Sequence, residues 1–182
     1  MKFTSKCAAV VAAGAAVVLM AAPASQADSI APITPTSVVN NNSKLCLVVE
    51  NGSTANGARA VQGQCGSGEW QISLDGVQTL AGDPSGAVPG FTDFRIVNAR
   101  SGKCLEIADS RKDDGAPAQQ WDCRDGLKTQ IWQLDGSPGY IVNKNSGKVL
   151  EIENSGLKAG ARAQQWSKAK TAPGQVWRWT LG

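Results

Sequence analysis

Residues 102–123 read GKCLEIADSRKDDGAPAQQWDC, and residues 147–168 read GKVLEIENSGLKAGARAQQWSK. The two stretches align without a gap at an offset of 45 residues, and both contain the strings LEI and AQQW. A weaker copy, KLCLVVENGSTANGARAVQGQC at residues 44–65, aligns with the first stretch so that Cys46 matches Cys104 and Gln62 matches Gln120. A motif that recurs in register indicates a structure built from similar units. The chain is therefore predicted to contain three copies of one unit.

Short aliphatic runs separated by Gly, Asn, Asp and Ser fill each copy, a pattern typical of strands and turns. No stretch after the N-terminal segment has helical periodicity. Each copy ends on a tryptophan: Trp70, Trp132 or Trp177. The prediction is an all-β fold of three pseudo-symmetric repeats, about 37–74, 94–135 and 139–181, with a Gly- and Pro-rich loop at 75–93. The repeat tryptophans are expected to converge in a shared core, where a closed structure leaves no free sheet edge.

Four cysteines fall within the repeats: Cys46, Cys65, Cys104 and Cys123. The first and second are separated by the same interval as the third and fourth, and the third repeat has Val149 and Lys168 at the matching positions. An even number of cysteines in an exported chain indicates disulfides. Four cysteines permit three connectivities, and the repeat symmetry selects one disulfide within the first repeat and one within the second.

Residues 1–27 have the pattern of a secretory signal: Lys2 and Lys6, then an apolar run, then Ser25-Gln26-Ala27. The apolar run, about 15 residues, is shorter than the roughly 20 needed to span a bilayer. We expect a secreted, extracellular, monomeric protein with no membrane partner, in which residues 28–36 form a linker and 37–182 the domain. After removal of residues 1–27, the basic and acidic residues nearly balance. The sequence contains no run of basic residues of the kind that indicates nucleic-acid binding.

The repeats resemble the ricin B-type lectins. Gln130-Ile131-Trp132 and Gln175-Val176-Trp177 are similar to the Q-x-W signature of that family, and Cys104-Leu105-Glu106-Ile107 to its C-L-D-V segment. Gln119 to Cys123 resembles the Q-x-W-x-C segment that follows. The resemblance covers about residues 37 to 181. It implies a β-trefoil fold and a non-enzymatic, carbohydrate-binding function of the type found in bacterial binding modules, with galactose- or xylose-type sugars or polysaccharides as ligands and no cofactor.

The resemblance also implies which side chains hold sugar. An acid accepts hydrogen bonds from hydroxyls, a flat ring covers the apolar face of the pyranose, and an amide fixes orientation. The expected sugar-binding residues are Glu106, Gln119, Trp121, Thr129 and Gln130 in the second repeat, and Glu151, Gln164, Trp166 and Gln175 in the third.

Two substitutions separate these sites from the family pattern. Glu replaces the usual Asp, and Thr129 and Gly174 stand where Asn is usual. The first repeat has Val48, Val61 and Gly63 at the site positions, so it is expected to be structural only.

Two other function classes compete with a lectin. For an enzyme, the chain has no histidine, which removes Ser-His-Asp and Cys-His catalysis and most zinc sites. Glu106 and Glu151 are expected on different lobes, too far apart to act as a glycosidase pair. The second alternative is a β-trefoil scaffold that binds a protein, for instance a protease inhibitor, through an exposed loop at 75–90.

Overall fold

The computed structural model describes residues 36–66, 70–73, 93–136 and 139–181. The chain divides into two units, Met1–Ala31 and Pro32–Gly182, and every described residue belongs to the second unit. The predicted signal peptide and residues 75–92 of the predicted loop lie outside the described residues. Their assignment stays a prediction.

The described part of the chain contains twelve strands of four or five residues, four in each repeat. The prediction of several short strands in each repeat is confirmed. They are β1 (Thr36–Asn40), β2 (Cys46–Val49), β3 (Ala60–Gly63), β4 (Trp70–Ser73), β5 (Arg95–Asn98), β6 (Cys104–Ile107), β7 (Ala118–Trp121), β8 (Trp132–Asp135), β9 (Tyr140–Asn143), β10 (Val149–Ile152), β11 (Ala163–Trp166) and β12 (Trp177–Leu181). Five short 3₁₀ turns connect them: η1 (Glu50–Gly52), η2 (Ala108–Ser110), η3 (Lys128–Gln130), η4 (Glu153–Ser155) and η5 (Pro173–Gln175).

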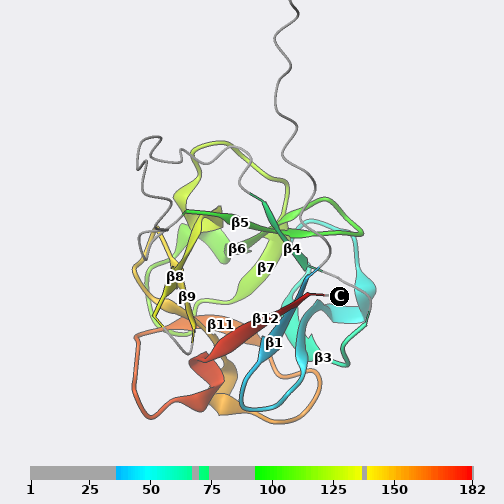
Figure 1. The fold of residues 1–182 in the computed structure, drawn as a ribbon. Helices are drawn as coiled ribbons and strands as arrows, with labels where there is room; N and C mark the ends of the chain where they lie inside the picture. The colour runs from blue at the N-terminus through cyan, green and yellow to red at the C-terminus, as the bar shows by residue number, and fades with distance from the viewer. Residues whose placement is uncertain (1–35, 67–69, 74–92, 137–138, 182) are drawn as a thin grey trace, which may run out of the picture. The chain divides into compact units, whose positions relative to one another are not determined.

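The first and fourth strands of the repeats pair with one another. β1 pairs with β4 and β12, β4 with β5, and β8 with β9. Phe94 and Trp132 exchange two backbone hydrogen bonds of 2.9 Å, which joins the second repeat's own ends, and Trp177 N donates to Gly139 O at 2.9 Å. The middle strands form three hairpins, β2–β3, β6–β7 and β10–β11. The predicted all-β trefoil is confirmed (Figure 1).

In each repeat, a buried glutamine on the second strand of the hairpin makes hydrogen bonds to a loop of another repeat. Gln120 on β7 donates to the carbonyls of Ser53 and Ala55 at 2.8 and 3.0 Å. The equivalent Gln165 bonds a loop of the second repeat, and Gln62 bonds a loop of the third. Because the third repeat contacts the first in the same way, the three units close on one another. The second strand of every hairpin therefore lies beside a loop from another repeat.

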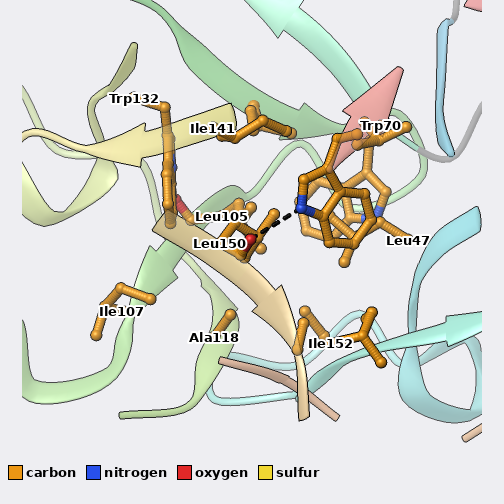
Figure 2. Close-up of a cluster of buried hydrophobic side chains, with 14 of the residues drawn as sticks. Leu47, Trp70, Leu105, Ile107, Ala118, Trp132, Ile141, Leu150 and Ile152 are labelled. Carbon is orange, nitrogen blue, oxygen red and sulfur yellow. Dashed lines mark hydrogen bonds between the residues drawn. The ribbon is translucent and has the colours of Figure 1, made fainter. Parts of the chain in front are cut away.

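The repeat tryptophans fill the core, as predicted (Figure 2). Trp70, Trp132 and Trp177 are fully or almost fully buried among the repeated leucines and isoleucines. Figure 2 labels Trp70 and Trp132 in this cluster. Trp132 Nε1 donates to Leu105 O at 3.0 Å, and Trp177 Nε1 donates to Leu150 O at 2.9 Å. These bonds satisfy polar atoms whose burial is otherwise costly. They also tie the last strand of a repeat to its hairpin, which carries the candidate site.

Both predicted disulfides are present. Cys46 bonds Cys65, and Cys104 bonds Cys123, with Cα atoms 5.0 and 5.1 Å apart. Each joins the start of one hairpin strand to the chain just after the other strand. The third repeat holds the same hairpin without this crosslink, with buried Val149 at the first position.

Candidate functional site

The carboxylate of Glu106 lies at the centre of the second-repeat site. It stands on β6 directly opposite Gln119 of β7, so both side chains share one face of the hairpin. Gln119 Nε2 donates to Glu106 Oε1 and Gln130 Nε2 donates to Oε2, both at 2.9 Å. Glu106 is only 6% exposed. The two amides hold a nearly buried acid in one orientation, with lone pairs left to accept further hydrogen bonds.

Turn η3 braces this carboxylate from behind. Gln130 is fully buried; its Nε2 also donates to Asp122 O at 2.9 Å, and its Oε1 accepts from Arg124 N at 2.8 Å. The Thr129 hydroxyl donates to Ile107 O at 2.9 Å and accepts from Ile107 N at 3.2 Å. Of the two residues expected at this wall, Gln130 contacts the acid, whereas Thr129 uses its hydroxyl on the backbone of β6.

Trp121 forms the side of the same site. It follows Gln119 by two residues on β7, so its ring stands on the same face as the acid. The ring is half-buried and does not belong to the core. A pocket of about 200 Å³ is open between it and the acid, lined by Glu106, Asp109, Ser110, Gln119, Trp121, Arg124 and Leu127. This volume is below the range of about 300–1,000 Å³ typical of pockets for drug-sized ligands, and it suits a small ligand.

The preceding repeat completes the wall behind the ring. A β-carbon placed on Gly57 would lie 3.6 Å from Cζ3 of Trp121, so the ring packs against this loop of the first repeat. Gly57 has φ +79°, a conformation that glycine adopts without strain. Asn56 exchanges hydrogen bonds with Asp122, the residue after Trp121. The site is thus built from two repeats.

The third repeat presents the same arrangement in a more open form. Gln175 Nε2 donates to Glu151 Oε2 at 3.0 Å, as Gln130 does to Glu106. Gln164 lies opposite Glu151 in the hairpin, but no donor in the described part of the chain reaches Glu151 Oε1. Trp166 is 41% exposed, and its Cζ3 would lie 3.5 Å from a β-carbon on Gly115 of the second repeat. The third-repeat acid therefore has one amide donor where Glu106 has two.

The substitution at Gly174 has a packing cause. A β-carbon at this position would lie 2.8 Å from Ser155 Cα and 2.9 Å from Ile152 O. Contacts this short leave no room for the side chain that the family pattern places there. Gly174 N instead donates to Ser155 Oγ at 3.0 Å. The middle of η5 is thus joined to η4 through Ser155.

The corresponding surface of the first repeat is closed. Val48 and Val61 face each other across the hairpin, where the other repeats have an acid and a glutamine. Gly63 takes the place of the exposed ring, and a β-carbon there would lie 2.7 Å from Cγ2 of Val48. An aromatic side chain would therefore collide with the valine.

Four residues that line the second-repeat pocket were absent from the expected set: Asp109, Ser110, Arg124 and Leu127. They lie on η2 and on the loop before η3, outside the strings that the repeats share. Three of them differ between the copies: Asp109, Arg124 and Leu127 are replaced by Asn154, Ala169 and Ala172 in the third repeat, whereas Ser110 matches Ser155. The shared strings predicted the common residues of the sites and could not indicate those that differ.

Burial has the largest effect on the pKa of the Glu151 carboxyl. Burial raises the pKa of its carboxyl above the usual range, and nearby Asp114 raises it further against the hydrogen bond from Gln175. Asp114 itself stays ionised, since the hydrogen bond from Lys148, with help from Ser167, lowers its pKa. Because Asp114 belongs to the second repeat, the charge of the third-repeat acid depends on how two repeats pack.

A pH dependence follows for any ligand held by the ionised third-repeat acid. In a Trp121→Ala variant, which keeps only the third-repeat ring, binding should weaken as the pH falls from about 7.5 to about 5, because Glu151 takes up a proton at a higher pH than an ordinary glutamate. Isothermal titration at several pH values measures this. The additional substitution Glu151→Gln should remove the dependence. Constant affinity over this range would contradict the prediction.

No helix among the described residues is long and apolar enough to cross a membrane. Nor do those residues contain a cluster of three potential metal ligands.

Comparison with known proteins identifies the family. The family model described as ricin-type β-trefoil lectin domain-like matches residues 70–166 and 128–180. A comparison with curated protein sequences gives no match.

Solved structures agree with the family match. The designed three-fold symmetric protein ThreeFoil is 29% identical, with a TM-score of 0.67, covering 80% of this chain and 96% of its own. The exo-β-1,3-galactanase 1,3Gal43A from Clostridium thermocellum is 28% identical, with a TM-score of 0.68, covering 82% of this chain but 30% of its own. The Rhizoctonia solani agglutinin, 13% identical over 83% of this chain and 96% of its own at a TM-score of 0.65, shares the fold. The chain belongs to the ricin-type β-trefoil lectin domain-like family.

Proposed function

We propose that this protein is a secreted, non-catalytic lectin that binds galactose- or xylose-type sugars, preferably in polysaccharides, through the second and third repeats. The observation that carries the proposal is the repeated triad of a nearly buried acid, an amide that holds it and a tryptophan outside the core. A lone structural acid would need no ring beside it. The family and the two disulfides, which are typical of exported proteins, support the same conclusion.

The chemistry of each group fits a pyranose. Glu106 and Glu151 are oriented by amides and accept hydrogen bonds from neighbouring hydroxyls, which are stronger for a charged acceptor. The indole faces of Trp121 and Trp166 cover the apolar C–H surface of the ring. No step of a reaction is required of either acid. Galactan is a natural first ligand to test, since one structural neighbour is an exo-β-1,3-galactanase.

Two sites on one domain favour polymers. A single shallow site of this kind is expected to bind with a Kd on the order of 1 mM, about −4 kcal/mol. Simultaneous occupation of both sites raises the apparent affinity for a polymer without any new contact. The first repeat adds nothing to binding, because Val48 closes its surface over Gly63. The alternative of a protease-inhibiting scaffold stays a prediction, since its loop lies outside the described residues.

The double substitution Glu106→Gln and Glu151→Gln tests the proposal while preserving side-chain volume. Loss of the two charges should weaken the binding of galactan or xylan at least about tenfold, because charge-assisted hydrogen bonds become neutral ones. Affinity electrophoresis in gels containing each polymer measures the effect. Gln130 retains its bonds to Asp122 and Arg124, so only the half-exposed Gln119 amide has to turn over.

The stability of the same variants is the control. The raised pKa of Glu151 means that the folded state holds this proton more tightly than the unfolded chain does. Ionisation of Glu151 therefore costs folding free energy, and wild-type stability should fall as the pH rises through its pKa. Glu151→Gln removes that cost, so its Tm at neutral pH should equal or exceed that of the wild type. Unchanged polymer binding by the folded double variant would refute the proposed function.

A further inference from the structure

We infer that the second-repeat site selects sugars that carry an anionic substituent, a carboxylate or a sulfate, through Arg124. This inference rests on the proposed function and names the ligand class of one of its two sites. Arg124 lines the same pocket as Glu106, Gln119 and Trp121. A neutral pyranose held by an acid and an indole has no charged group that could pair with a guanidinium at the wall of its pocket. An anionic group is the ligand that a guanidinium binds best, through paired hydrogen bonds.

The backbone of Arg124 is fixed on several sides. Its N–H donates to Gln130 Oε1 at 2.8 Å, and its carbonyl accepts from Arg95 Nη2 at 2.7 Å. The preceding residue, Cys123, is crosslinked to Cys104 on the strand that carries Glu106. A backbone held in this way keeps Arg124 at the edge of the pocket and limits the entropy lost when the residue binds a ligand.

The guanidinium of Arg124 has no ion pair or hydrogen bond within the described residues, whereas two nearby cations have partners. Arg95 pairs with Asp125, and Lys103 with Asp122. The pKa of Asp122 is lowered mainly by hydrogen bonds from Lys103 and Asn56, and the charge of Arg124 has a smaller effect on it. The charge of Arg124 therefore remains available to a ligand.

The acids in the pocket set the orientation of such a ligand. Glu106 and Asp109 both line it, so an anionic substituent has to lie against Arg124 while the hydroxyls turn toward Glu106. The apolar wall of Leu127 offers no competing donor. This division matches a sugar acid or a sulfated sugar, which has hydroxyls on one side and a charge on another.

The third repeat is a natural control. Ala169 N donates to Gln175 Oε1 at 2.8 Å, the same bond that Arg124 N makes to Gln130, so the backbone at this position is held in the same way and carries alanine in place of arginine. The two sites of this protein therefore differ in preference: both accept neutral sugars, and the second binds a sugar with an anionic substituent more tightly.

The test isolates each site in the full chain. Trp166→Ala keeps the second-repeat site, and Trp121→Ala keeps the third. Each is titrated by calorimetry or NMR with galactose, xylose, galacturonate, glucuronate and galactose 6-sulfate. The Trp166→Ala variant should bind an anionic sugar about fivefold more tightly than its neutral counterpart, and added salt should reduce the preference. Preference for uronates alone identifies a carboxylate ligand, and preference for the sulfated sugar alone identifies a sulfate.

Side-chain exchange decides whether Arg124 is responsible. Arg124→Ala in the Trp166→Ala background should bring anionic and neutral sugars to equal affinity, Arg124→Lys should keep part of the preference, and Ala169→Arg in the Trp121→Ala background should create it. Equal affinity for both classes before the exchange, or a preference that survives Arg124→Ala, overturns this inference and leaves sugar binding intact. Absence of binding to every sugar overturns the proposed function as well.

Discussion

Replacing Trp121 and Trp166 together by alanine is expected to abolish retention of the protein on immobilised galactan and xylan. Removing an aromatic side chain on which a ligand ring stacks costs roughly 1–3 kcal/mol of binding free energy, a large share of the about 4 kcal/mol available to a millimolar site. Each single variant keeps one site and should lose the gain from simultaneous binding, so both should elute early but after the double variant. Retention is measured by affinity chromatography at constant ionic strength.

Two controls separate binding from folding and from adsorption. Neither ring belongs to the core, so far-UV circular dichroism and the Tm should show that the double variant is folded. Apart from Trp166, Leu157 on a third-repeat loop is the large exposed hydrophobic residue among those described, with 63% of its surface exposed. The substitution Leu157→Ala should leave retention unchanged. Full retention of the double variant would show that the two indoles take no part in binding.

Removing the disulfide of the second repeat is expected to destabilise the protein by about 3 kcal/mol. A crosslink that closes a short loop lowers the conformational entropy of the unfolded chain by about this amount. The substitutions Cys104→Val and Cys123→Lys copy the third repeat, which keeps the same hairpin with Val149 and Lys168. Val149 is buried like Cys104, so the environment accepts this side chain. Urea unfolding of wild type and variant measures the difference.

The first repeat supplies the matched control for this change. Cys46→Val with Cys65→Lys opens a loop of the same sequence separation and should cost a similar free energy of unfolding. Only the second-repeat variant should also weaken sugar binding, since Cys123 lies between Trp121 and Arg124. Equal binding losses in the two variants would mean that the effect is global. No loss of stability in either would mean that the disulfides do not restrict the unfolded chain.

Much of this molecule could be predicted from repetition in its sequence. The in-register spacing of the copies predicted three units, the buried positions of Trp132 and Trp177, and both disulfides, and the structure confirms them. These features depend on neighbours within one unit. A strand places alternate residues on one face, and a hairpin sets its cross-strand partners, so the local pattern contains the necessary information.

Contacts between units were decided only by the tertiary structure. Gly57 of the first repeat lies behind Trp121 of the second, and Asp114 acts on the charge of Glu151. In each pair, the two residues lie in different repeats and on different elements, so no local sequence pattern links them. They meet because each hairpin packs against a loop of another repeat, and that packing, not the strand pattern, sets the shape and charge of each site.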